Sequence, residues 1–456
     1  MTREKRNNDI AEYPDDFDGP VAAPSPEDIP PTQQEAPVPV KIEEVPFNTL
    51  PLHPLILKKA AELGYVNATP IQAAAIPLAV QNHDVVGQSG TGSGKTVTFG
   101  LPILQRVTPR YGIQALILTP TRELCVQIAE VMTVFGTLFD LQVTTVYGGV
   151  GMEPQIEALR NADIVVATPG RTLDHLSHKT IDFKNVRFLV LDEADKMFEM
   201  GFYEDVEEII RHIPKQRQTM LFTATLNGKV TRLMQKYLYQ PEIVRIHEYA
   251  DPHDLKQSFY DVRPNEKFGL LTHLLRMRAP GLAIVFCAAR YEVDLVADNL
   301  KRQGIPAAAI HGGIEQSKRL KAIVQMREQN MDILVATDVA ACGLDIKNVT
   351  HIYNWSLPKT SEEYIHRIGR TARAGASGDA ITILSPDDHE NFRRILSDHS
   401  LTVDKLPIPP FPKLPFVRAE RRDRGFGPPR EGGREGGFGM RRGPMRGPPR
   451  GMHSRR

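Results

Sequence analysis

Two short segments of this chain carry residue types that could together hydrolyse a nucleoside triphosphate. Residues 92–96 read Gly-Ser-Gly-Lys-Thr, and residues 192–195 read Asp-Glu-Ala-Asp. The backbone N–H groups of a glycine-rich loop can surround a polyphosphate, and a lysine can neutralise it. An acidic pair after an apolar strand can hold the other side of a Mg²⁺ ion and a water molecule. The two segments therefore predict one nucleotide-hydrolysing site.

The first segment is expected to bind the phosphates. Lys95 would neutralise the β- and γ-phosphates, and the Thr96 hydroxyl would ligate Mg²⁺. Ser89 stands where the pattern G-x-x-x-x-G-K-[ST] has its first glycine, and we expect a small residue to fit there. A glycine-rich turn that binds nothing is the alternative, but a strand before the loop and a helix after it favour phosphate binding. The backbone amides would come from Gly92, Ser93 and Gly94.

The second segment is expected to hold the metal and the attacking water. Residues 189–191 (Leu-Val-Leu) are typical of a strand core, so Asp192 and Glu193 would emerge at its end. Asp192 suits Mg²⁺, directly or through a water, and Glu193 suits deprotonating or orienting the attacking water. An acidic helix start is the alternative for an isolated Asp-Glu pair. That alternative is weak beside a phosphate loop.

A third segment, residues 366–373, reads His-Arg-Ile-Gly-Arg-Thr-Ala-Arg. Arginines such as these stabilise the charge that develops during phosphoryl transfer. They lie in the second half of the chain, whereas the phosphate loop lies in the first. A site completed by both halves would hydrolyse its nucleotide only when they close. A solvated basic helix face is the alternative.

Strands and helices alternate in the pattern of the middle of the chain. Runs of Val, Ile and Leu without polar alternation are typical of parallel strands buried on both faces. Between these runs lie helical patterns, such as the apolar positions 293, 296, 297 and 300. The alternation predicts an α/β fold with two doubly wound parallel sheets, whose ligands bind beyond the carboxyl ends of the strands. Apolar runs precede motifs at 87–96, 119–124, 168–171, 192–195, 223–225, 287–290, 311–313 and 337–345.

The two ends of the chain carry opposite charge. Residues 1–45 contain 11 acidic and 4 basic residues, whereas residues 416–456 contain 12 arginines and 4 acidic residues. Both ends are expected to be disordered, because they have too few large apolar residues to offset the entropy of ordering. The predicted organisation is an acidic tail (1–45), a first domain (46–246), a linker (247–255), a second domain (256–415) and an Arg/Gly-rich, polyanion-binding tail (416–456).

The composition also bears on the compartment. No apolar run approaches the roughly 18 residues of a membrane span, and no signal peptide is visible. Cys125, Cys287 and Cys342 are far apart, which indicates a reducing compartment without a disulfide framework. We therefore expect a cytoplasmic protein with no membrane partner, although a nuclear location stays open.

With these motifs in this order, the chain resembles the DEAD-box RNA helicases of superfamily 2 from about Phe47 to about Leu384. The resemblance implies two tandem RecA-like domains, with ATP and Mg²⁺ as cofactors and RNA as partner. It implies that Phe47 stacks on adenine and that Gln72 bonds the edges of the base. The other implied nucleotide contacts are Gly343, Asp345 (to the ribose), Arg370 and Arg373 (to the γ-phosphate).

The resemblance also implies contacts with the RNA backbone. Thr and Gly amides with one Arg per loop suit phosphates and sugars rather than base edges, so binding is expected to be independent of sequence. A turn between strand and helix is the alternative for each loop taken singly. The expected contacts are Pro120, Thr121, Arg122, Gly148, Gly149, Thr168, Pro169, Gly170, Arg171, Arg290, Gly312 and Thr337. The residues expected to couple hydrolysis to RNA are Asp195, Thr223, Thr225, His366 and Arg367.

Three single positions and one triplet depart from the family pattern. Thr223 stands where serine is usual, and its hydroxyl remains. Cys342 replaces a usual arginine, and a thiol cannot supply the five N–H donors of a guanidinium. Ala372 replaces a usual glycine and would be strained if the position needs a positive φ. Residues 288–290 (Ala-Ala-Arg) replace a more polar triplet, so we expect activity with weaker stimulation by RNA.

The predicted function is that of an ATP-dependent RNA helicase. Its domains would close over ATP and RNA, separate short duplexes or remodel ribonucleoproteins, and release RNA after hydrolysis. The alternative is an ATP-gated RNA clamp or assembly factor with little unwinding, which Cys342 favours and a strand-displacement assay would distinguish. A DNA translocase conflicts with the adenine-reading and Asp-Glu-Ala-Asp signatures. The Arg/Gly tail is expected to bind RNA or ribonucleoprotein partners, or else only to keep the protein in solution.

Overall fold

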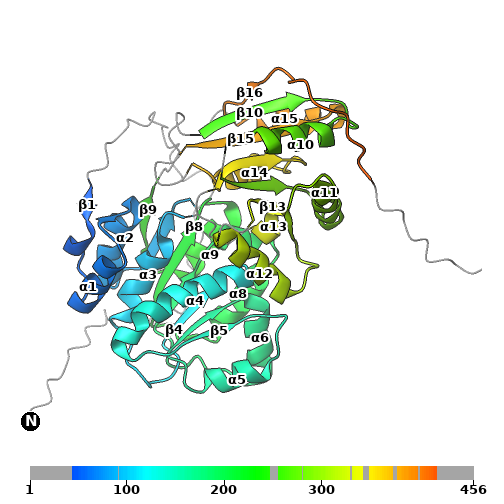
Figure 1. The fold of residues 1–456 in the computed structure, drawn as a ribbon. Helices are drawn as coiled ribbons and strands as arrows, with labels where there is room; N and C mark the ends of the chain where they lie inside the picture. Colours follow the sequence, from blue (N-terminus) through cyan, green and yellow to red (C-terminus); the bar gives the residue numbers. More distant parts are fainter. Residues whose placement is uncertain are drawn as a thin grey trace, which may run out of the picture. The chain divides into compact units, whose positions relative to one another are not determined.

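Two parallel β-sheets dominate the structure, a computed structural model that describes residues 44–90, 92–246, 255–279, 281–328, 331–341, 349–372, 377–398 and 401–417. Within these ranges each sheet has seven strands, and every neighbouring pair in them is parallel (Figure 1). A small antiparallel pair, β1 (Val45–Pro46) with β2 (Asn67–Ala68), precedes them. The predicted fold, two tandem doubly wound domains, is confirmed.

The first sheet has the order β5-β6-β4-β7-β8-β3-β9. Its strands are β3 (Val85–Gln88), β4 (Ala115–Leu118), β5 (Val143–Val146), β6 (Ile164–Ala167), β7 (Phe188–Leu191), β8 (Gln218–Thr223) and β9 (Glu242–Arg245). The helices of this part are α1 (Pro54–Glu62), α2 (Pro70–Val80), α3 (Lys95–Leu104), α4 (Arg122–Gly136), α5 (Glu153–Leu159), α6 (Pro169–Ser177), α7 (Ala194–Glu199), α8 (Tyr203–Arg211) and α9 (Gly228–Tyr237).

The second sheet has the order β12-β13-β11-β14-β15-β10-β16. Its strands are β10 (Leu255–Asp261), β11 (Leu282–Phe286), β12 (Ala308–Ile310), β13 (Ile333–Ala336), β14 (Val349–Asn354), β15 (Gly378–Leu384) and β16 (Asp404–Lys405). Its helices are α10 (Lys267–Met277), α11 (Arg290–Arg302), α12 (Gln316–Arg327), α13 (Asp338–Ala341), α14 (Ser361–Ile368) and α15 (His389–Ile395). None of the described helices is long and apolar enough to cross a membrane.

Burial on both faces explains why the strands read as continuous apolar runs. In β7, Leu189 and Leu191 belong to one core cluster and Val190 belongs to the cluster on the opposite face. Successive strand residues point to opposite faces, so a sheet covered on both sides needs an apolar residue at every position. These covered sheets fix the carboxyl ends of their strands, where the motif loops lie.

The structure shifts two of the predicted domain boundaries. Leu255, predicted to end the linker, is the first residue of β10 and is buried. Phe416, predicted to begin the basic tail, packs against Phe268 and Trp355 with ring centroids 5.2 and 5.6 Å apart. Val417 exchanges two hydrogen bonds with the Asn299 side chain, at 2.9 and 3.0 Å. The packed part of the second domain therefore extends to Val417, because Phe416 buries apolar surface against Phe268 and Trp355. Residues 1–43, 247–254 and 418–456 lie outside the described part.

Candidate functional site

The glycine-rich loop joins β3 to α3 at the carboxyl edge of the first sheet. Gly92 and Gly94 have φ values of +86° and +94°, and Gly94 is the N-cap of α3. A Cβ at Gly94 would lie 2.3 Å from Gln72 Nε2, so no larger residue fits there. Lys95 is buried and its Nζ donates to the Ser89 carbonyl at 3.2 Å. The loop thus presents a helix N-terminus and a buried lysine to the same space, as an anion site requires.

Ser89 fits the position where the usual pattern has a glycine. Its φ is not in the left-handed region, and its hydroxyl lies 2.9 Å from the hydroxyl of Ser93. Ser93 Oγ also donates to the Gly90 carbonyl at 3.0 Å. A serine therefore closes the loop with a side-chain hydrogen bond where no glycine conformation is needed.

The predicted adenine-reading segment packs directly on this loop. Gln72 is buried, accepts a hydrogen bond from the Thr69 amide at 2.9 Å and donates one to the Gly94 carbonyl at 3.3 Å. Phe47 differs from the expectation of a stacking platform. Its ring is only 1% exposed and packs against Tyr65 at 5.2 Å between centroids. A ring buried in the core offers no free face to a base, so the structure gives Phe47 a packing role beneath the segment.

The acidic segment lies at the end of β7, whose neighbours in the sheet are β4 and β8, and β3 follows β8. Burial raises the pKa of Asp192 to about 7; Lys95 opposes the shift and the Glu193 carboxylate adds to it. Glu193 adopts φ +50° and ψ +49°. The left-handed conformation costs a residue with a Cβ about 1–2 kcal/mol. Such strain is concentrated at functional sites, where the surrounding structure holds it.

Asp195 ties the acidic segment to the end of β8. Its Oδ2 accepts hydrogen bonds from the Ala224 amide at 3.1 Å, the Thr225 amide at 2.8 Å and the Thr225 hydroxyl at 3.1 Å. The Thr223 hydroxyl donates to the Thr225 carbonyl at 2.8 Å. Three of the five residues predicted to couple hydrolysis to RNA, Asp195, Thr223 and Thr225, therefore form one hydrogen-bonded unit. A displacement of residues 224–225 at the end of β8 would therefore strain or break the hydrogen bonds that these residues make with Asp195.

The residues present fit a magnesium nucleotide. Mg²⁺ prefers few protein ligands together with phosphate oxygens and waters. In the described ranges no group of three or more His, Cys, Asp or Glu side chains could hold a metal by itself. Asp192, by contrast, is a buried carboxylate with a raised pKa beside a lysine. A bound cation would favour the ionised form of this group.

The loops after β4, β5 and β6 form a second cluster at the other end of the same edge. Arg122 lies against Gly149, since a Cβ there would be 2.0 Å from its Nη1. Gly148 lies between two guanidinium groups: a Cβ there would be 3.5 Å from Arg122 Nη2 and 3.9 Å from Arg171 Nη2. Arg171 Nη1 donates to the Val150 carbonyl at 3.1 Å.

Two helix N-termini complete this cluster. Thr121 caps α4, accepting from the Leu124 amide at 3.3 Å, and Thr168 is the N-cap of α6, whose first residues are Pro169 and Gly170. Pro120 lies in the loop after β4, directly before the N-cap Thr121. Two arginines, two helix starts and two glycines therefore meet on one surface. This combination suits phosphates and sugars.

Gly149→Ala is expected to weaken RNA binding about tenfold, because a left-handed alanine costs about 1–2 kcal/mol and its Cβ displaces the Arg122 guanidinium. Nucleotide binding in the absence of RNA should not change. The measurement is fluorescence anisotropy of a labelled single-stranded RNA with a non-hydrolysable ATP analogue. Gly151→Ala is the matched control, since its Cβ would meet only Pro154 Cδ at 3.6 Å. Equal affinity in both variants would contradict the role of this contact.

The second sheet repeats the arrangement with fewer groups. Arg290 begins α11 and lies over Gly312, where a Cβ would be 3.2 Å from its Nη2. Thr337 follows β13, which lies between β11 and β12 in the sheet. His311 lies in the loop after β12, with Nε2 2.9 Å from Asp294 Oδ1 and Nδ1 3.1 Å from the Gly313 amide. The three predicted second-domain contacts thus lie at neighbouring strand ends.

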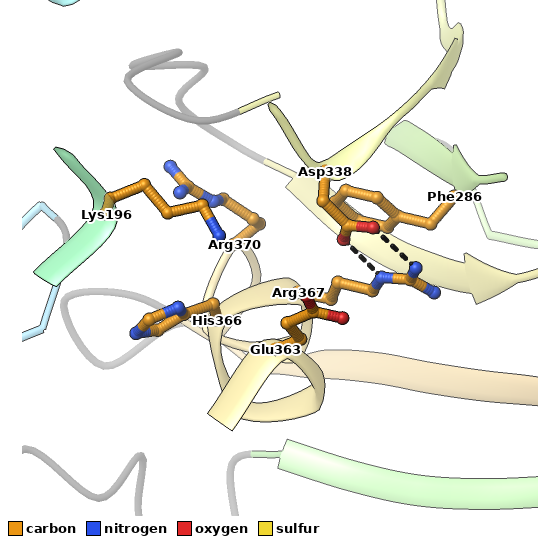
Figure 2. Close-up of a pocket in the computed structure, with 7 residues that line it drawn as sticks. All are labelled: Lys196, Phe286, Asp338, Glu363, His366, Arg367 and Arg370. Atoms are coloured by element: carbon orange, nitrogen blue, oxygen red, sulfur yellow. Dashed lines mark hydrogen bonds and ion pairs between the residues drawn. The ribbon is translucent and has the colours of Figure 1, made fainter. Parts of the chain in front are cut away.

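Two of the three arginines in the Arg-rich segment, Arg367 and Arg370, belong to the described residues and are shown in Figure 2. Arg367 is 2% exposed: its Nη2 donates to Asp338 Oδ2 at 2.7 Å, its Nη1 donates to the Ser356 carbonyl at 2.6 Å, and its guanidinium lies 5.1 Å from the centre of the Phe286 ring. Arg370 has none of these partners; it is 8% exposed and lines the same pocket as Arg367, together with Lys196 and His366. The resemblance assigns Arg370 to the γ-phosphate and Arg367 to coupling, and the structure adds that Arg367 is buried and held by hydrogen bonds.

His366 lies close enough to the acidic segment to interact with it electrostatically. Burial lowers its pKa, and the Asp195 carboxylate opposes the shift. The imidazole is therefore held neutral near pH 7, since its ordinary pKa is already below that value. His366 and Asp195, both predicted to couple hydrolysis to RNA, are within range of each other.

Ala372 has φ +53°, so the position does need the conformation that the usual glycine supplies. Ala372→Gly is expected to stabilise the second domain by about 0.5–1 kcal/mol, because relief of left-handed strain exceeds the extra unfolded-state entropy of glycine. A urea titration measures the change. Ala61→Gly, on the exposed face of α1, should instead destabilise by about 1 kcal/mol. A lower midpoint for Ala372→Gly would contradict the strain.

Four residues singled out from the sequence lie outside the described part: Cys342, Gly343, Asp345 and Arg373. Their predicted roles stay predictions.

The sequence did not reveal one buried ion pair. Arg319 Nη2 lies 3.0 Å from Glu123 Oε1, and these side chains are 10% and 2% exposed. Glu123 follows Arg122 in the first domain's motif, whereas Arg319 belongs to α12 of the second. Their charge types alone gave no signal, because charged residues on helices are most often solvated.

Comparisons with known proteins agree with this geometry. Residues 69–233 match the family model described as DEAD/DEAH box helicase, and residues 266–375 match the helicase conserved C-terminal domain. A DEAD-box ATP-dependent RNA helicase, CshA of Geobacillus kaustophilus, is 44% identical over 80% of this chain and 78% of its own length.

Two solved structures share the fold. Dbp5 of S. cerevisiae, bound to RNA and ADP BeF3, has a TM-score of 0.73 and 30% identity over 80% of this chain and 96% of that one. Mss116p, bound to ssRNA and AMP-PNP, has a TM-score of 0.71 and 26% identity over 80% of each chain.

Proposed function

Because the chain belongs to the DEAD-box ATP-dependent RNA helicases, we propose that two separate parts of its first sheet bind ATP and RNA. The enzyme hydrolyses ATP and acts as an RNA helicase. The strand order carries the assignment. The phosphate, acidic and coupling loops follow the strands β3, β7 and β8, which are neighbours in the sheet. The loops that lead to Arg122 and Arg171 follow β4 and β6, and the loop with Gly148 and Gly149 follows the next strand, β5. One edge of one sheet therefore offers a nucleotide site beside a polyanion site.

Hydrolysis follows from the groups at the nucleotide site. The amides of residues 92–94 and Lys95 Nζ hold the β- and γ-phosphates. Glu193 orients the attacking water and accepts its proton. Thr96 and Asp192 would hold Mg²⁺, which supplies positive charge to the phosphate oxygens. Gln72 donates a hydrogen bond to the Gly94 carbonyl and so positions the phosphate loop. A base bound beside Gln72 therefore affects the position of the loop that holds the phosphates.

Coupling follows from the shared edge. Arg122, Arg171 and the starts of α4 and α6 hold the RNA backbone, and Arg290, Gly312 and Thr337 of the second domain extend the same interface. Arg370 and Arg373 complete the nucleotide site from the second domain. ATP and RNA then both bind best when the two domains are closed on each other. Binding of either ligand therefore favours the closed arrangement and raises the affinity for the other. Closure separates a short duplex, and hydrolysis releases the strand.

The experiment that tests this function measures ATP turnover without nucleic acid, with single-stranded RNA and with DNA of the same sequence. We expect strong stimulation by RNA alone, accompanied by displacement of a strand from a short RNA duplex. Equal turnover in all three conditions would overturn the coupling. An ATP-gated clamp, which would bind RNA without displacing a strand, is not favoured, since the relatives are named RNA helicases.

The remaining assignments concern the ends of the chain and its location. The arginines of residues 418–456 are proposed to hold RNA or ribonucleoprotein partners through charge and stacking. Deletion of this tail should weaken RNA binding and make it less sensitive to salt. The cytoplasmic location stays a prediction, which fractionation of cells would check.

A further inference from the structure

An exposed tyrosine lies in the RNA-facing part of the second domain. Among the described residues three tyrosines are exposed: Tyr111 (64%), Tyr239 (42%) and Tyr291 (66%). Tyr111 and Tyr239 precede β4 and β9, at the edge of the first sheet opposite its motif loops. Tyr291 is the second residue of α11, directly after Arg290, at the motif edge of the second sheet. Tyr291 thus exposes an aromatic ring next to an arginine that is proposed to bind a phosphate.

The backbone that carries Tyr291 is held firmly. Glu292 Oε2 accepts hydrogen bonds from the amides of Ala288 and Ala289 at 3.1 and 3.2 Å, and from the Ser356 hydroxyl at 3.0 Å. The start of α11 is therefore fixed to the loop before it and to the end of β14. A tyrosine on a fixed helix start loses little conformational entropy when it makes a contact.

The neighbouring loop lacks other side chains that could contact a nucleotide. Residues 288 and 289 are alanines, so in this turn only Arg290 and Tyr291 can reach a nucleotide with polar or aromatic groups. Arg290 lies over Gly312 and suits a phosphate. Unpaired bases have two faces that stack readily on aromatic rings, whatever their identity.

We propose that Tyr291 stacks on a base of the single-stranded RNA whose backbone Arg290 holds. The inference rests on the proposed RNA-binding function and adds one base contact to an interface otherwise suited to phosphates and sugars. The contact is tolerant of sequence, because every base has a π-face. It makes the affinity depend on the presence of a base, and it compensates for the polar groups missing at 288 and 289.

The test compares two RNAs of equal length and charge, one with all its bases and one that is abasic throughout, using the full chain and a non-hydrolysable ATP analogue. Tyr291→Ala should lose about 5- to 100-fold in affinity for the first RNA, the range measured for one stacked base, and nothing for the abasic RNA. Tyr291→Phe should retain the wild-type affinity, since the ring is kept. Tyr111→Ala is the matched control, with equal exposure at the other edge of a sheet.

The salt dependence separates stacking from charge. Arg290→Ala should reduce the slope of log affinity against log salt by about 1, whereas Tyr291→Ala should leave the slope unchanged. An equal loss on both RNAs, or no loss for Tyr291→Ala, would overturn the inference while leaving the RNA function intact. If the wild-type protein bound neither RNA, the proposed function would fall, and the inference with it.

Discussion

Glu193→Gln is expected to reduce RNA-stimulated ATP turnover about 10²–10⁴-fold, the range that a positioned general base contributes. Glutamine keeps the size of the side chain but cannot accept a proton from the attacking water. The left-handed backbone at φ +50° is set by the bend between β7 and α7, so the substitution should not move it. Steady-state turnover with saturating RNA measures the effect.

Binding should survive this substitution. Lys95 and the residue 92–94 amides still hold the phosphates, so the affinity for fluorescent ATP should change less than about threefold, equivalent to under 1 kcal/mol. RNA bound together with ATP should dissociate more slowly, because hydrolysis no longer releases it. Glu204→Gln, an exposed glutamate in the first turn of α8, is the control and should retain full turnover. Turnover of Glu193→Gln at the wild-type rate would exclude Glu193 as the base.

Arg370→Ala and Arg367→Ala are expected to fail in different ways, although the residues stand three positions apart. Arg370→Ala should lower turnover by about 10³-fold or more, as loss of an arginine that stabilises phosphoryl transfer does. The fold should remain, because Arg370 holds neither Asp338 nor the Ser356 carbonyl. Turnover and the thermal midpoint, measured on the same preparation, give both readouts.

Arg367→Ala should instead destabilise the second domain by about 2–4 kcal/mol, because it leaves buried partners of a charged hydrogen-bond network unpaired. The expected loss lies somewhat below the usual range of about 3–5 kcal/mol for a broken buried ion pair, because Asp338 is 23% exposed. Arg367→Lys should restore little, as an ammonium cannot reach Asp338, Asn354 and the Ser356 carbonyl together. If Arg367→Ala lost turnover at an unchanged midpoint, Arg367 would have a chemical role after all.

Local pattern was sufficient to predict much of the fold. The apolar runs at 115–118, 164–167, 188–191 and 333–336 coincide with β4, β6, β7 and β13. They could be found from sequence because a strand buried on both faces needs apolar residues in succession. The strands β5 and β15 alternate buried and half-buried positions over part of their length. They therefore lack the continuous apolar run that identifies the other strands in the sequence. The short edge strand β16 has only two residues, both of them charged, so it carries almost no local signal.

Local pattern could not show whether a side chain of a given type is exposed at the site or buried in the core. Phe47 carries the residue type of a stacking platform, yet the structure buries its ring against Tyr65. Arg367 and Arg370 carry the same guanidinium, yet only Arg367 is tied to Asp338. What decides each case is burial and the partner in space. Neither is encoded in the residue itself or in its neighbours along the chain.

The sequence by itself determined which chemistry the chain contains: a phosphate loop, an acidic pair, arginines and the covered parallel strands that hold them. These signals are local, since a glycine-rich turn, a helix start or an apolar run needs only a few consecutive residues. Only the tertiary structure decided which of these loops are neighbours along the edge. The loops follow β3, β4, β5, β6, β7 and β8 along the chain, but the order β5-β6-β4-β7-β8-β3 groups the three loops proposed to bind RNA apart from the three proposed to bind ATP. Strand order depends on contacts between residues far apart in the chain, and such contacts produce no periodic pattern in the sequence.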